Sequence, residues 1–219
     1  MNEKKENSPF RDLVASWSEF EALRSILGEP SPLALHKTVR TLDAHCRRFI
    51  ALSPFLVLST ANEQGLCDAS PRGDAPGFVS VLDDRHLAIP ERPGNRRMDS
   101  IRNILGNPHI GLLFMIPGLG ETLRINGKAC IVRDPELLES MSVQGRAPML
   151  AIGVEVEEIF VHCAKAFRRS KLWEPDSWHE HDELPAISRM LADQVKGRLE
   201  VSAEQVDGLL QESYTKRMY

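Results

Sequence analysis

The feature that most constrains the fold lies in the middle of the chain. It is a series of short runs that are either apolar throughout or alternate between apolar and polar residues, each followed by turn residues. Four such runs cover residues 55–61, 66–70, 77–83 and 86–90, and the segments "NEQG", "PRGDAP" and "DDR" separate them. Apolar and β-branched residues in short or alternating runs are typical of strands, and Gly, Pro, Asn and Asp are typical of turns. Four strands in so short a segment predict an antiparallel meander.

Three further runs continue this pattern, at residues 109–117, 121–134 and 149–163, and a helix is predicted over 96–105 between the fourth and fifth strands. The run at 121–134 is long enough to curl around a barrel, and Gly127 within it predicts a bend or a bulge. The sum is a closed or nearly closed antiparallel β-barrel with peripheral helices, a mainly β fold.

Helical patterns flank this barrel on both sides. Residues 10–50 are helical in pieces, 135–142 begin a short helix with Asp134 as N-cap, and 164–185 are predicted to be a polar loop. The tail predicts two helices, 186–195 and 201–214, the second opened by a Ser202/Gln205 capping box. We therefore divide the chain into a helical extension (1–50), a barrel domain (51–175) and a helical tail (176–219).

The stretch "ERPGNRRMDSIRNILGNPHIGLLF" (91–114) carries an unusual charge arrangement. Asn95 is predicted to cap the helix, and Arg92, Arg96 and Arg97 crowd its N-terminus. Cations are disfavoured there by roughly 0.3–1 kcal/mol each, because the unpaired N–H groups carry a partial positive charge. A bound phosphate would account for this arrangement. The alternative is that these arginines are solvated or pair with Glu91 and Asp99.

Two other basic elements are candidates for ligand contact. Arg72 lies in the tight Pro/Gly turn of "SPRGDAPG" (70–77); the alternative is an arginine paired to Asp74 or Asp68. In "FRRSKLW" (167–173), cations flank an aromatic side chain and could fold over a planar ligand, unless the segment is an ordinary surface loop. The residues concerned are Arg168, Arg169, Lys171 and Trp173.

The order of these elements resembles the flavin-binding split-barrel family of pyridoxamine 5′-phosphate oxidase. The resemblance covers about residues 50–175 and is strongest over 91–132. It implies an antiparallel split barrel that binds FMN. Asn95, Arg96 and Arg97 stand where the family motif has Ser-Arg-Lys, which grips the FMN phosphate, and Thr122 stands where it has a flavin-contacting glutamine.

The resemblance also implies a homodimer with two FMN sites at the subunit interface, so that Arg168, Arg169, Lys171 and Trp173 would reach the flavin of either subunit. The chain departs from the oxidase proper in two places. The segment between "NRR" and "NP" is about one helical turn longer, and the Arg-x-His motif that contacts the vitamin substrate is not evident. Pyridoxamine 5′-phosphate is therefore not carried over as substrate.

The function expected is an FMN-dependent oxidoreductase that acts on an unidentified small molecule, with NAD(P)H as a possible electron source. The alternatives are a flavin- or haem-binding protein without turnover, and a deazaflavin-dependent reductase on the same barrel. FMN itself carries the redox chemistry, so we assign no catalytic residue.

Composition excludes several other classes of function. The net charge of −4 and pI near 6.0 do not favour a nucleic-acid partner, and no apolar window is long enough for a membrane span. The four cysteines form no C-x-x-C pair and predict neither a metal site nor a disulfide scaffold. We expect a cytoplasmic protein.

Overall fold

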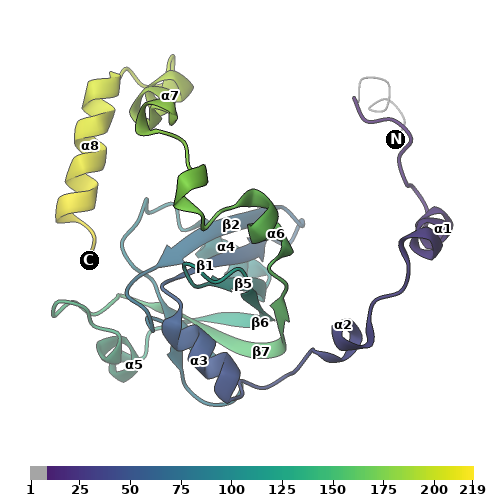
Figure 1. Cartoon of the computed structure of the whole chain (residues 1–219). Coiled ribbons are helices and arrows are strands. Elements are labelled where there is room, and N and C mark those ends of the chain that lie inside the picture. Colours follow the sequence, from purple (N-terminus) through teal and green to yellow (C-terminus); the bar gives the residue numbers. More distant parts are fainter. Residues whose placement is uncertain (1–8) are drawn as a thin grey trace. The chain divides into compact units, whose positions relative to one another are not determined.

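The computed structural model describes residues 9–219 and divides the chain into two compact units, Met1–Lys37 and Thr38–Tyr219. The first unit holds α1 (Trp17–Leu27) and α2 (Pro32–His36), labelled in Figure 1. Ser16 and Glu19 form a capping box at the start of α1, and Gly28 ends this helix with φ +83°, a left-handed value that glycine adopts without steric cost. Both ends of α1 therefore follow from local sequence.

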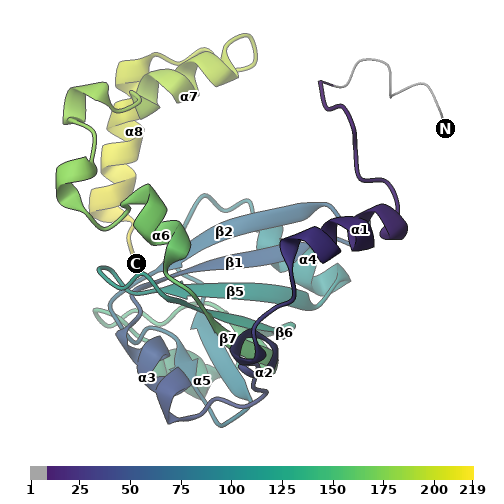
Figure 2. The same ribbon diagram turned by 45° about the vertical axis from the view of Figure 1, so that its right-hand side comes forward.

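The second unit is built on one seven-stranded antiparallel sheet with the strand order β2-β1-β5-β6-β7-β4-β3. Figures 1 and 2 show the sheet with helices at its periphery. This confirms the predicted mainly β split barrel with peripheral helices. The strands are β1 (Phe55–Ala61), β2 (Cys67–Gly73), β3 (Ser80–Val81), β4 (His86–Pro90), β5 (His109–Met115), β6 (Thr122–Val132) and β7 (Ala151–His162).

The larger of two hydrophobic clusters fills the curl of the sheet, and the smaller one packs α5 (Pro135–Ser140) against β4 and β7. Strand residues that point inward are fully buried, and Cys46 and Ile50 of α3 (Ala44–Leu52) join the larger cluster. Alternation along β1 and β5 places every second side chain in this core, as period-two patterning requires. The largest buried strand side chains are Leu56, Leu58, Leu87, Ile89, Leu112, Phe114, Leu123, Ile125, Ile152 and Ile159.

Gly127 occupies a β-bulge in β6, as predicted. The register between β6 and β7 shifts between Asn126 and Gly127. A Cβ atom at Gly127 would lie 2.1 Å from the carbonyl oxygen of Glu155, so the two backbones approach here more closely than any side chain permits. This bulge lets the long β6 strand bend around the core.

The helix after β4 begins later than predicted. α4 spans Asp99–Gly106, and its N-cap is Met98 rather than Asn95. Asn95 instead forms a turn, because its Oδ1 accepts a hydrogen bond of 3.0 Å from the backbone N–H of Arg97. Arg96 and Met98 take left-handed φ values of 60° and 59°. The prediction that the helix begins at Arg96 was therefore wrong. A tight turn precedes it, and the helix begins at Asp99.

Among the strands, β2 and β3 differ most from the sequence prediction, and β5, β6 and β7 differ from it by one or two residues at their ends. β2 continues through Pro71 and Arg72 to Gly73, so Arg72 lies within a strand and not in a turn. Proline is tolerated because β2 is an edge strand. The run at 77–83 contributes only Ser80–Val81, since Gly77 has φ +85° and Phe78 N–H bonds to the carbonyl of Ala75 in a turn.

The remaining helices follow β6 and β7. α5 (Pro135–Ser140) has the predicted Asp134 cap, and α8 (Ala203–Lys216) has the predicted Ser202/Gln205 capping box. The chain at 164–185 was predicted as a loop, but α6 (Lys165–Ser170) forms there. Two 3₁₀ turns and α7 (Ile187–Val195) lie between α6 and α8. Within residues 9–219 no helix has the length and apolar character that crossing a membrane requires.

Candidate functional site

Two ion pairs join the chain beyond β4 to the β2 edge of the sheet. Arg72 of β2 pairs with Glu91, which follows β4, and both side chains are mostly buried. Arg92 donates through Nε to Asp74 Oδ2 at 2.7 Å, and the Asp74 side chain is only 2% exposed. β2 and β4 share no backbone ladder. Side-chain pairs therefore connect the two sides of the split in this barrel.

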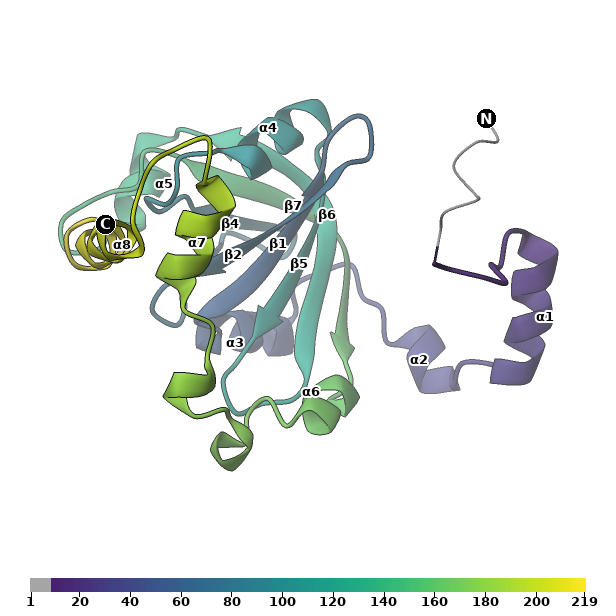
Figure 3. The same cartoon turned by 90° about the horizontal axis from the view of Figure 1, so that it is seen from above.

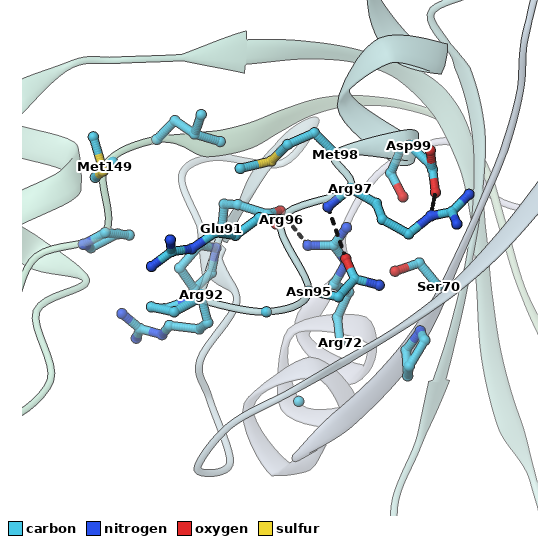
Figure 4. A pocket seen from close by; sticks show the side chains of 18 of the residues that line it. Ser70, Arg72, Glu91, Arg92, Asn95, Arg96, Arg97, Met98, Asp99 and Met149 are labelled. Carbon is cyan, nitrogen blue, oxygen red and sulfur yellow. Dashed lines mark hydrogen bonds and ion pairs between the residues drawn. The ribbon is translucent and has the colours of Figure 1, made fainter. Parts of the chain in front are cut away.

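A cavity of about 830 Å³ lies along this split. Its size is in the range of roughly 300–1,000 Å³ that is usual for small-molecule and cofactor sites. Figure 4 shows several of its lining side chains. The lining comes from β2 (68–73), the segment 90–100 that includes the start of α4, the loop 146–150, Phe78 and Tyr219.

β2 forms one wall of the cavity. Its side chains alternate between exposed and half-buried, with Asp68, Ser70 and Arg72 on the half-buried face. Asp68 accepts a hydrogen bond of 3.0 Å from Ser100 Oγ in the first turn of α4, which joins the helix start to the strand. Because side chains along a strand point alternately to its two faces, these three polar side chains lie together on the cavity side of β2. The side chains between them are exposed on the other face.

The turn before α4 forms the opposite wall. The left-handed conformations of Arg96 and Met98 are uncommon for residues other than glycine, and such strained residues cluster at ligand sites. No side chain in the described part of the chain caps the α4 N-terminus. Its first N–H groups therefore remain available to an anion, as at other helix N-termini.

The arginines of the cavity differ in how they are paired. Arg97 donates through Nε to Asp99 at 2.7 Å, but this pair is exposed and contributes about 0–1 kcal/mol. The Nε of Arg72 is buried and has no hydrogen-bond partner within residues 9–219. A buried donor without a partner costs about 1–3 kcal/mol, which a ligand oxygen would recover.

The formal charge of the lining is positive. Five arginines (72, 92, 96, 97 and 146) face three carboxylates (68, 91 and 99), so the excess is 5 − 3 = 2 positive charges. A phosphate monoester carries about −1.5 to −2 charges near pH 7. The net positive charge, the unpaired Nε of Arg72 and the start of α4 together suit a phosphate group. The rest of the cavity has room for a planar ring system.

A family model described as pyridoxamine 5′-phosphate oxidase matches residues 42–163, which is more than half of the chain. The chain belongs to this family. Among curated proteins, none matches the sequence. The match contains all seven strands and α4, and therefore most of the cavity lining.

Solved structures similar to this member of the oxidase family have low sequence identity to it. HupZ of Group A Streptococcus is 20% identical over 54% of this chain and 92% of its own, with a TM-score of 0.45. An FAD-binding protein from Mesorhizobium loti is 18% identical over 56% and 95%, with a TM-score of 0.40. HutZ, the haem storage protein of Vibrio cholerae, is 18% identical over 55% and 94%, with a TM-score of 0.40.

The structure of this family member brings together four of the predicted site residues. Arg72, Asn95, Arg96 and Arg97 all line the cavity. The partner of Arg72 is Glu91 and not Asp74 or Asp68, which were the alternatives from sequence. In Figure 4, Arg72 lies between Asn95 and Glu91, and Arg97 extends toward Asp99.

The other five predicted residues do not line this cavity. They lie around the β5–β6 turn: Thr122 pairs with His162 at the start of β6, and Trp173 donates through Nε1 to the carbonyl of Leu119 at 2.9 Å. Three strand spacings, about 14 Å, separate β6 from β2 within the sheet. In Figure 3, α6 and α4 lie at opposite ends of the long strands. The five are Thr122, Arg168, Arg169, Lys171 and Trp173.

Sequence reasoning missed several residues of the cavity wall. Arg146 and Tyr219 line the cavity and were not considered at all, and Asp74, which holds Arg92 from outside the lining, was considered only as a partner of Arg72. Arg146 follows Gly145 in a tight turn, which was a usable local signal. Tyr219 carried no such signal, since it is far from the other lining residues in sequence. Within the described residues no group of His, Cys, Asp and Glu could hold a metal ion.

Proposed function

We propose that the protein is an FMN-dependent oxidoreductase that acts on a small molecule. The observation that carries this proposal is the arginine-lined cavity at the split of the barrel, with the buried, unpartnered Nε of Arg72 in its wall. Membership of the pyridoxamine 5′-phosphate oxidase family supports the choice of a flavin.

Each element of the cavity has a part in holding the cofactor. Arg96, Arg97 and the N-terminus of α4 would bind the phosphate, and Arg72 would offer its free Nε to a ligand oxygen. Asn95 holds the turn that presents these arginines. FMN, when bound, supplies the transfer of a hydride or of single electrons. Two electrons lost by NAD(P)H would then reduce one molecule of acceptor.

The absorbance spectrum of the purified protein tests this proposal first. We expect a yellow protein that releases FMN on heating, or an apoprotein that binds added FMN. Stopped-flow mixing with NAD(P)H, followed by a candidate acceptor, should then show turnover. A flavoprotein that reoxidises slowly and independently of the acceptor would be a binding protein. Release of deazaflavin or haem instead of FMN would contradict the proposed cofactor.

A homodimer would complete the site. Trp173 and the cations of α6 lie outside the cavity of their own chain, so they would serve a flavin in the cavity of a second copy. Thr122 is only 4% exposed, so its side chain would not reach that flavin. An isologous contact supplies such residues twice, once for each of two sites. Light scattering should give about twice the chain mass of 24.6 kDa. A mass of one chain, in protein loaded with FMN, would contradict the shared site.

A further inference from the structure

Tyr219 returns to the cavity from the far side of the tail helices. Its hydroxyl donates to Asp74 Oδ1 at 2.8 Å, and its main-chain oxygen accepts a hydrogen bond of 2.6 Å from Arg146 Nη1. The guanidinium of Arg92 lies 5.6 Å from the centre of its ring, within the range of a cation–π contact. One residue therefore contacts two segments of the cavity lining, at Arg92 and Arg146, and the Asp74 carboxylate next to that lining.

The Asp74 carboxylate makes this contact strong. It is almost fully buried and accepts hydrogen bonds from the backbone N–H of Ala75, from Arg92 and from Tyr219. Burial raises the pKa of Asp74, but these three donors outweigh it and hold the pKa below its ordinary value. Hydrogen bonds to an ionised carboxylate are about twice as strong as neutral ones. Tyr219 is thus bound to a fixed charge next to the cavity lining.

The segment before Tyr219 is attached to the barrel at its other end. Trp173 stacks on Phe167 with ring centres 5.6 Å apart and bonds to the carbonyl of Leu119. Between these two attachments, α7 and α8 pack on each other, and Figures 1 and 2 show them projecting from the sheet. Their apolar side chains remain largely exposed, as at Met190 (46%) and Leu209 (56%). The segment 173–219 therefore has the form of a strap tied at both ends.

We propose that this strap controls the exchange of the ligand, with Tyr219 as its latch. The latch closes one side of the cavity when Tyr219 bonds to Asp74 and Arg146, and its release opens that side for FMN to enter or leave. This inference rests on the proposed function for the identity of the ligand, but the docking of Tyr219 is independent of it. α7 and α8 pack on each other and leave most of their apolar side chains exposed, so a single hydrogen-bonded residue can decide whether the strap is closed.

Ligand-exchange rates test the latch. Tyr219→Phe removes the bond to Asp74 and keeps the ring, and Tyr214→Phe, on the exposed surface of α8, is the matched control. Stopped-flow fluorescence should show that Tyr219→Phe raises both the association and the dissociation rate of FMN about tenfold or more, with Kd within threefold. The control should match the parent. Unchanged rates, or a faster dissociation alone with an equally weakened Kd, would contradict a latch.

The docking of Tyr219 can be measured without FMN. The chain has two tyrosines, so Tyr219 is the single tyrosine of the Tyr214→Phe variant. Its hydrogen bond to Asp74, and then its burial, raise the pKa of Tyr219 above the ordinary value of a tyrosine. Absorbance titration of the phenolate should therefore give a higher midpoint in folded protein than in urea. Equal midpoints would overturn the docking, whereas failure of the parent protein to bind FMN would overturn the proposed function and ligand exchange with it.

Discussion

Replacing Arg96 and Arg97 together by alanine is expected to weaken FMN binding by about 3–6 kcal/mol, which is at least about a hundredfold in Kd. Each side chain would lose a charge-assisted hydrogen bond to the phosphate, worth about 1.5–3 kcal/mol. Fluorescence titration of the apoprotein with FMN measures the effect. The stability of the apoprotein should change little, because Arg96 is exposed and the Arg97–Asp99 pair is solvated.

Arg102→Ala is the matched control for this experiment. Arg102 belongs to α4 and is exposed, but it does not line the cavity. The control removes one positive charge from α4 itself, close to the turn that holds Arg96 and Arg97, so it shows how much a general loss of positive charge in this region weakens binding. A double variant whose FMN affinity stays within threefold of the parent would remove the phosphate assignment and leave these arginines as solvated surface residues.

The second large effect concerns stability. Gly127→Ala is expected to destabilise the barrel by about 3 kcal/mol or more, because its Cβ would lie 2.1 Å from the backbone oxygen of Glu155. The atoms that this Cβ would meet belong to the backbone and not to the end of a flexible side chain. β6 and β7 must therefore move apart, or the bulge must be lost. Urea unfolding followed by tryptophan fluorescence measures the loss, and for a chain of this length it corresponds to a decrease of about 6–12 °C in Tm.

Gly208→Ala provides the comparison. Gly208 lies within α8, and no atom lies within 4 Å of the position its Cβ would take. Alanine there should stabilise the helix by up to about 1 kcal/mol, since glycine is the poorer helix former. If the two alanine variants unfolded at the same urea concentration, the close approach of β6 and β7 at the bulge would be refuted.

Local sequence was sufficient for most of the elements. β1 and β4 have the predicted bounds, the caps at Asp134 and Ser202 are present, and Gly127 forms the bulge. These features depend on contacts between residues near one another in the chain, or on an alternation that one strand carries by itself. The errors at α4 and β3 arose where left-handed turns and side-chain hydrogen bonds compete with the helix or strand pattern.

The same reasoning from local sequence predicted only part of the candidate site. The cluster of arginines before α4 could be recognised because it conflicts with the helix dipole, and the structure places it in the cavity wall. The partners of those arginines could not be recognised. Arg72 pairs with a residue beyond the end of another strand, and Asp74 accepts from Tyr219 across 145 residues of sequence.

The sequence by itself therefore determined the order of the strands, the bounds of β1 and β4, the bulge, the helix caps at Asp134 and Ser202, and the family of the protein. Only the tertiary structure decided which charges meet at the split of the barrel and that Tyr219 lines the cavity. The physical reason is that strand and cap preferences are local energies of a few neighbouring residues, whereas an ion pair or a cavity exists only after distant segments have been brought together by burial of the common core.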